Sequence, residues 1–203
     1  MTIQRHFANS DLAEMVDIAR GTAIRTSFNH KFGAVPSMSN NNSGTIWDVD
    51  DTTYPWTALD TPAVVNVERN HVADEGFIVT VQGLDSNYNF QSEDIVISGT
   101  NTLGTKLFRR VNRAFVTSDG VTNTGDIDIE AGAAGGTTVA RINAGKGQTL
   151  MAVFTVPANK TAFITQVTAT VQSGADATGD LFIKFFGQDT FRVGHSFEVS
   201  GAG

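Results

Sequence analysis

The chain has 203 residues and a net charge of −7, only 17% of its residues are charged, and it contains no cysteine. Because charged residues usually make up roughly a quarter of a protein, much of the surface must consist of Thr, Ser, Asn, Gln and Gly. The acidic balance argues against nucleic-acid binding, which needs clusters of Lys and Arg; the densest cluster is Arg109, Arg110 and Arg113. The absence of cysteine excludes disulfides and thiolate chemistry.

Neither a secretory signal nor a membrane span is expected. The first residues, MTIQRHFANSDLAEMV, have no apolar stretch of the kind that a secretory signal needs. No run approaches the roughly 18 apolar residues of a membrane span. We therefore expect a soluble protein that is made without a signal and binds no membrane.

Residues 1–62 show no strand periodicity, and we expect them to form an extended N-terminal arm with one short helix. Asp11 can cap the helix and Glu14 stands three residues on, as in a capping box. Gly21 is a suitable stop. The apolar stripe of this helix is formed by Leu12, Met15, Val16 and Ala19. About ten residues are too few for a stable isolated helix, so the stripe must dock on the body or on another subunit.

After this helix, aromatic residues alternate with Pro, Gly and Asn, which is typical of an irregular segment held by aromatic anchors. The apolar groups of the arm are too dispersed to form a core of their own. We therefore predict that the arm buries large apolar side chains against neighbouring chains. The predicted partner-binding residues are Leu12, Met15, Val16, Phe28, Phe32, Trp47 and Trp56.

From residue 63 to residue 203 the sequence predicts an all-β body. Turn-forming residues separate the predicted strands at about 8–12 residues, the spacing of a sandwich or barrel. The predicted strands are 63–68, 76–81, 91–98, 106–108, 110–117, 125–130, 137–142, 148–156, 161–172, 181–186 and 191–199. The predicted fold is an antiparallel β-sandwich or jelly-roll-like body that follows the arm.

The clearest alternation lies in residues 161–172, TAFITQVTATVQ. Phe163, Val167 and Val171 fall on one face, whereas Gln166 and Thr168 fall on the other. One apolar and one polar face is the pattern of a half-buried antiparallel strand.

The sequence gives no pattern that favours a reaction centre or a metal site. His6, His30, His71 and His195 lack the spacing of metal ligands, and scattered loop or surface histidines explain them better. The run Asp48–Asp51 superficially resembles a calcium loop, but Thr53 and Leu59 stand where an EF-hand needs Gly and Glu.

Asp126 and Asp128 share one face of a predicted strand, where a solvated edge is a simpler interpretation than a catalytic carboxylate pair. Gly145–Thr149 resembles the tail of a phosphate-binding loop, but Ala140 replaces its first Gly, so the segment reads as a hairpin turn. No G-x-S-x-G elbow is present. We therefore predict no catalytic, cofactor-binding or metal-binding residue and no enzymatic activity.

Trp47, Tyr54 and Trp56 could form a platform that stacks on sugars. The alternative is that they anchor the arm on the sandwich or on a partner, and we favour this interpretation. A carbohydrate-binding or receptor-binding module nevertheless stays open as a second function.

Several segments resemble a group of tailed-bacteriophage virion structural proteins. They are FNHKFG at 28–33, IWD at 46–48, VTVQGLD at 79–85 with Asn87-Tyr88, FRRVNRAFV at 108–116 and GKGQTLMAVFTVPANKTA at 145–162. The last is the most specific, and one extra Arg at 109–110 departs from the family pattern. Together the likeness spans roughly residues 28–199.

The resemblance implies a non-enzymatic capsid decoration (cement) protein, or alternatively an accessory component of the head, tail or portal. Its implied partners are the major capsid protein or other virion proteins, and its implied location is the virion, assembled in the host cytoplasm. It favours a symmetric homo-oligomer, a trimer before a dimer, and the low surface charge suits such contacts. Members of the family continue past residues 191–199 with further strands. Two interpretations stay open: this chain is a shorter natural variant, or another chain completes its last sheet.

Overall fold

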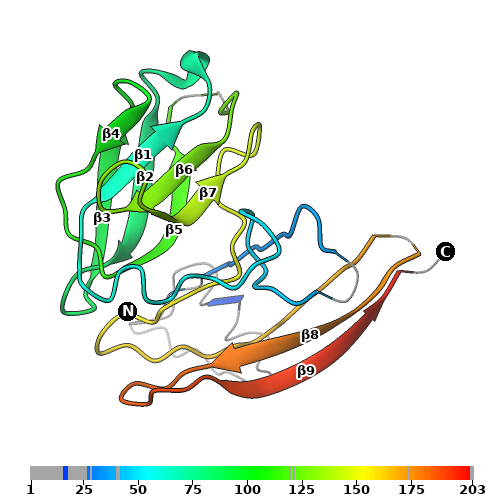
Figure 1. Cartoon of the computed structure of the whole chain (residues 1–203). Coiled ribbons are helices and arrows are strands. Elements are labelled where there is room, and N and C mark those ends of the chain that lie inside the picture. Colours follow the sequence, from blue (N-terminus) through cyan, green and yellow to red (C-terminus); the bar gives the residue numbers. More distant parts are fainter. Residues whose placement is uncertain are drawn as a thin grey trace, which may run out of the picture. The chain divides into compact units, whose positions relative to one another are not determined.

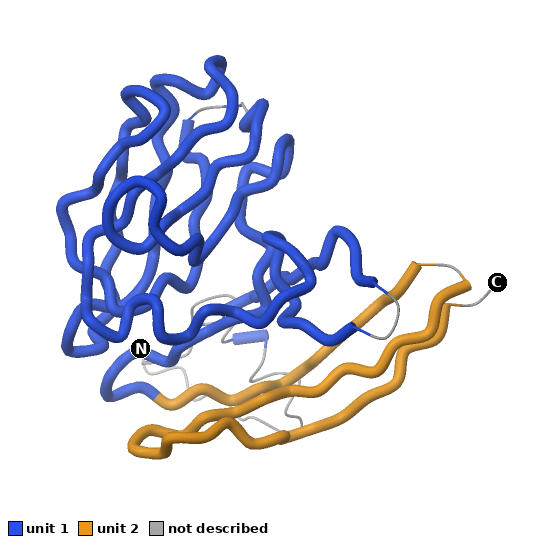
Figure 2. Tube along the Cα trace, viewed as in Figure 1, with its two compact units in different colours: residues 1–160 blue, residues 161–203 orange. Residues whose placement is uncertain are grey.

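The computed structural model describes residues 16–17, 27, 29–39, 42–118, 120, 122–172 and 174–201. Their regular structure is almost entirely β, in antiparallel sheets that form a sandwich-like fold (Figure 1), and this confirms the predicted fold class. The chain divides into two compact units, residues 1–160 and residues 161–203 (Figure 2). This division lies far from the predicted boundary at residues 62 and 63.

The first unit is a sandwich of two antiparallel sheets. One sheet has the order β4-β1-β6-β7 and the other the order β3-β2-β5. The first sheet consists of β1 (Val65–Arg69), β4 (Asn101–Leu103), β6 (Ile127–Ala131) and β7 (Thr137–Ile142). The second consists of β2 (Ile78–Leu84), β3 (Phe90–Val96) and β5 (Arg110–Val116), and the short 3-10 helix η1 (Val72–Asp74) lies between β1 and β2.

Both sheets contribute their apolar faces to one core. Val65 and Val67 of β1 are fully buried, as are Val79 and Val81 of β2. Burying each such side chain contributes about 1.5–3 kcal/mol. The other buried apolar side chains of this core are Trp47, Tyr54, Leu59, Ile95, Ile97, Phe108, Val111, Ala114, Ile127, Ile129, Val139, Ala140, Ile142, Met151 and Val153.

The arm contributes to this core from within the same chain. Trp47 and Tyr54 are each 3% exposed, and their rings pack edge to face with centroids 5.1 Å apart. Tyr54 also packs against Trp56, which lies partly buried on the core. The prediction that Trp47 is buried by a neighbouring chain is therefore wrong, because the chain's own sandwich covers it.

The other predicted partner-binding residues differ in position. Phe32 and Val16 are exposed, so the structure leaves them accessible to a partner. Leu12, Met15 and Phe28 lie outside the described residues. Of the predicted helix, the described part comprises Val16 and Asp17, and both are helical.

Most predicted strands of the body coincide with observed ones, but three do not. Residues 106–108 form an isolated bridge between Phe108 and Ala63 instead of a strand. The reason is that the Glu93 carboxylate accepts the Thr105 and Lys106 backbone N–H groups, at 2.6 and 3.1 Å. Residues 148–156 make one bridge, from Gln148 to Phe115, and residues 161–172 are extended without belonging to a strand.

The second unit contains one β-hairpin. Strand β8 (Asp176–Ile183) pairs with β9 (Arg192–Ser200) in antiparallel register, with an irregularity between Leu181 and Phe182. The ring of Phe197 covers Gly179, where an added Cβ would lie 2.4 Å from the ring. The hydroxyls of Ser196 and Ser200 donate to Asp180 and Asp176, each at 2.6 Å.

Candidate functional site

The arm is fixed to the sandwich of the first unit along residues 148–156. Three backbone N–H groups make this connection. Ala34 N donates to Leu150 O at 3.0 Å, and Ala152 N donates to Ile46 O at 2.8 Å. Leu150 N donates to the Asp48 Oδ2 atom at 2.8 Å. We call this region the arm junction, and it consists of Lys31, Ala34, Ile46, Asp48, Asn112, Leu150, Ala152 and Thr155.

Asn112 joins three segments at the arm junction because it sits on a β-bulge. Strand β5 shifts register here: Gln82 pairs with Arg113 and Gly83 pairs with Val111, which leaves Asn112 without a partner in the ladder. Bulges of this kind redirect a side chain. The Asn112 amide donates to Thr155 O at 3.0 Å and accepts from Thr155 N at 2.9 Å. Its backbone oxygen accepts a hydrogen bond from Lys31 Nζ.

These contacts explain why residues 148–156 look like a strand in sequence but form no ladder. Met151 and Val153 alternate into the core, as they would in a strand. However, only its start pairs with β5, where Thr149 N donates to Ala114 O at 2.9 Å. From Leu150 onward the backbone partners are a carboxylate, a side-chain amide and two arm residues. The alternation of apolar residues here shows which side chains are buried. It does not show that the backbone pairs with another strand.

Burial shifts the pKa of two charged side chains at the arm junction, Asp48 and Lys31. Asp48 is 1% exposed, and burial raises the pKa of its carboxyl to about 6, although the Leu150 N–H bond acts in the opposite direction. Its Oδ1 atom has no hydrogen-bond partner among the described residues. Burial, followed by the charge of Arg113, lowers the pKa of Lys31 to about 8.

Charged groups with shifted pKa values are common in catalytic sites. Structural networks shift pKa values in the same way. Here Asp48 holds Leu150 and Lys31 holds Asn112, so each group fixes a segment of backbone. We interpret the arm junction as a structural connection.

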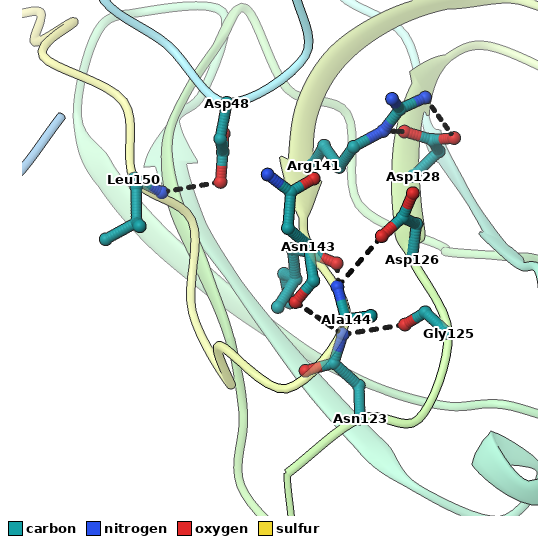
Figure 3. A network of polar contacts seen from close by, with 10 residues as sticks. Asp48, Asn123, Gly125, Asp126, Asp128, Arg141, Asn143, Ala144 and Leu150 are labelled. Atoms are coloured by element: carbon teal, nitrogen blue, oxygen red, sulfur yellow. Dashed lines mark hydrogen bonds and ion pairs between the residues drawn. The ribbon is translucent and has the colours of Figure 1, made fainter. Parts of the chain in front are cut away.

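A second polar network holds the loops beside β6 and β7 (Figure 3). Arg141 donates to both carboxylate oxygens of Asp128, at 2.6 and 2.9 Å, and Asp126 accepts from Ala144 N at 2.8 Å. Asp128 is buried, so the expected solvated edge is wrong at that position. The two carboxylates bind different partners, and they do not form the pair that a glycosidase would use.

The side chains of Asn123 and Asp74 also form hydrogen bonds to the backbone of these loops. The Asn123 amide donates to Gly125 O at 2.7 Å and accepts from Gly147 N at 2.9 Å. Gly145 and Gly147 have positive φ angles of 73° and 66°, so the segment is the turn that the sequence predicted. The Asp74 carboxylate accepts from Thr124 N and Gly125 N. These buried polar groups are thus committed to backbone donors and acceptors.

The structure does not bring the remaining candidates together. His71 caps η1, while His30 and His195 lie near Phe32 and Phe197; His6 is outside the described residues. Asp50 accepts from Thr52 N, and Asp51 accepts from Ser39 N. Asp48, Asp50 and Asp51 therefore accept hydrogen bonds from three different backbone N–H groups. Within the described part of the chain, no three His, Asp or Glu side chains are grouped as metal ligands would be.

The second unit carries a surface that sequence reasoning did not identify. Phe163 is 84% exposed and Phe182 is 56% exposed. Large apolar side chains that are exposed in one unit are candidates for contact with a partner. The large apolar side chains of this unit that are at least half exposed are Phe163, Ile164, Val167, Phe182, Phe185, Phe186 and Val193. A signal was present in LFIKFF at 181–186, where apolar residues occupy both faces of a predicted strand.

Comparison with protein-family models, curated proteins and solved structures finds no match to this chain. Among the helical residues that the structure describes, no helix has the length and apolar character needed to cross a membrane.

Proposed function

We propose that the chain is a non-enzymatic structural protein of a bacteriophage particle, where it binds neighbouring capsid subunits as a decoration protein and stabilises the shell. The resemblance of roughly residues 28–199 to virion structural proteins supports the phage context. The observation that carries the assembly role is the exposed apolar surface of the second unit, which includes Phe163 and Phe182. Its proposed location is the virion, and its proposed main partner is the major capsid protein.

The physical basis is linkage between binding and assembly. A protein that binds the assembled shell more tightly than its free subunits shifts the equilibrium toward the shell. Weak contacts suffice when one oligomer binds several sites at once, because the effective concentration multiplies their affinities. The acidic net charge of −7 would keep the protein from adhering to the packaged genome.

The carbohydrate-binding alternative loses the residues on which it depended. Trp47 and Tyr54 are buried in the core and cannot stack on a sugar. An accessory role at the tail or portal uses the same apolar contacts at another place in the particle, and it stays the second candidate.

The test is to add the purified chain to particles that lack it. We expect cryo-EM density for the chain between capsid subunits, and genome release at a higher temperature than in particles without it. Density confined to the tail or portal would replace the capsid role with the accessory one. Particles that neither bind the chain nor gain stability would overturn the proposal.

A further inference from the structure

Residues 161–172 have the composition of a strand but lack a strand's pairing. No charged residue occurs between Thr161 and Ala175, and Thr, Val and Ile dominate the segment. Such residues favour strands. The segment is extended, yet among the described residues the backbone of 161–171 makes no hydrogen bond. Natural edge strands usually carry charges or prolines that block pairing with other chains, and this segment has neither.

The hairpin of β8 and β9 is a sheet of two strands that could accept a further strand. Within the described residues its two strands pair with each other and with no third strand, so the outer edge of each is open. A two-stranded hairpin alone is at best marginally stable in water. Most of its side chains are exposed on both faces. The hairpin therefore needs a further strand to become a stable sheet.

Among the described residues, the segment does not pair with the hairpin of the same chain through backbone hydrogen bonds. Val167 and Ala169 line a hollow together with Phe197 and Val199 of β9. The segment thus approaches β9 through side chains, and within the described part of the chain the backbone of neither has a further strand as partner. The turn at 172–175 is closed by the Ala175 N–H to Gln172 O bond of 3.0 Å, and Gly201 N donates to Ala175 O at 2.7 Å.

We infer that a second copy of this chain completes the sheet, with residues 161–172 of one copy adding as a strand to the open edge of the β8–β9 hairpin of another. Every copy has both a strand to donate and an edge to accept one. The segment is long enough, since twelve residues of strand span about 40 Å and the 9 residues of β9 span about 30 Å at 3.3 Å per residue. Because one chain carries both the uncharged segment and the two-stranded hairpin, a second copy is the natural occupant.

The charges also fit a second copy. On the hairpin, Asp176 and Asp180 already accept hydrogen bonds from Ser200 and Ser196. The added strand is uncharged, so its arrival places no like charges opposite one another. Each copy can make two such contacts, one as donor and one as acceptor. If the exchange runs head to tail, it can close into a ring, as the expected trimer would require.

The experiment compares the wild-type chain with Thr165→Pro and with Thr165→Val as the matched control. Proline removes a backbone N–H and is poorly tolerated in a paired strand, whereas valine keeps strand propensity. By light scattering we expect oligomers for the wild type and for Thr165→Val, and the 21.6 kDa monomer for Thr165→Pro. Tryptophan fluorescence checks that the first unit stays folded, because Trp47 and Trp56 both lie in it.

Hydrogen exchange on the wild-type chain gives an independent measurement. We expect the amides of 161–172 to be protected in the oligomer and to exchange at least tenfold faster once dilution produces monomers. Three results would overturn the inference: a wild-type monomer at high micromolar concentration, an intact Thr165→Pro oligomer, or protection that persists in the monomer. The inference does not rest on the proposed phage role. If the chain formed the oligomer but did not bind phage particles, only the proposed phage role would be overturned.

Discussion

Replacing Asp48 by asparagine is expected to stabilise the first unit near pH 7 and to leave its stability almost unchanged near pH 4. The carboxyl is buried at the arm junction and its pKa is raised from the usual 3.8 to about 6. Asparagine keeps an oxygen that can accept the Leu150 N–H group, at present 2.8 Å from Asp48 Oδ2. The substitution therefore removes a buried charge but retains the contact.

The magnitude follows from the pKa difference. Because the folded pKa exceeds the unfolded one, the folded state binds the proton more tightly between pH 3.8 and 6. The Asp48 contribution to stability is complete at low pH and declines as the pH rises through this range. At about 1.4 kcal/mol per pKa unit, the cost of the ionised carboxylate at pH 7 is about 3 kcal/mol. We expect Asp48→Asn to recover most of it.

The assay is urea unfolding followed by tryptophan fluorescence at pH 4 and at pH 7. Both tryptophans lie in residues 1–160, so the signal reports the first unit. The upper pH lies below the pKa of about 8 to which burial lowers Lys31, so that lysine stays protonated. Asp128→Asn is the control, and it should lose about 1–3 kcal/mol because it disrupts the charged hydrogen bonds from Arg141. If Asp48→Asn were no more stable than the wild type at pH 7, the account of Asp48 would be wrong.

Two further predictions concern the bulge of β5. Asn112→Ala should lower the free energy of unfolding of the first unit by about 1–3 kcal/mol, because it leaves the Thr155 N–H and C=O groups without their partner; urea unfolding measures this, and Thr155→Ser is the control that should change little. Gly83→Ala should cost about 2 kcal/mol or more, because the new Cβ would lie 1.9 Å from Arg110 O. If Gly83→Ala had the same urea midpoint as the wild type, β2 and β5 could move apart at this position without loss of stability, and the prediction would be wrong.

Local signals were sufficient for the hairpins of the first unit. The β2–β3 and β6–β7 hairpins join neighbouring segments that alternate and are separated by turn residues. Strand β4 could not be found in this way, since it has three residues and pairs Asn66 with Leu103 across the sequence. The alternation in 148–156 and 161–172 predicted strands because alternation detects exposure on one side, and it carries no information about the pairing partner.

The arm junction was inaccessible to spacing arguments for a related reason. Asp48 and Leu150 are separated by 102 positions, so no local motif links them. The calcium-loop interpretation examined the neighbours of Asp48 in sequence, whereas its partner comes from the other end of the first unit. Asn112 was hidden by the bulge, because regular alternation gives no reason to expect its side chain at Thr155.

The two units differ in how much of their apolar surface and backbone they cover with their own residues. In the first unit, two sheets bury a common core, and side chains such as Asn112, Asp74 and Asn123 hold the loop backbones. In the second unit, one hairpin and one extended segment leave Phe163, Val167 and Phe182 at least half exposed. If a second copy supplies the missing strand, folding of the second unit and assembly become one step, whose equilibrium depends on concentration.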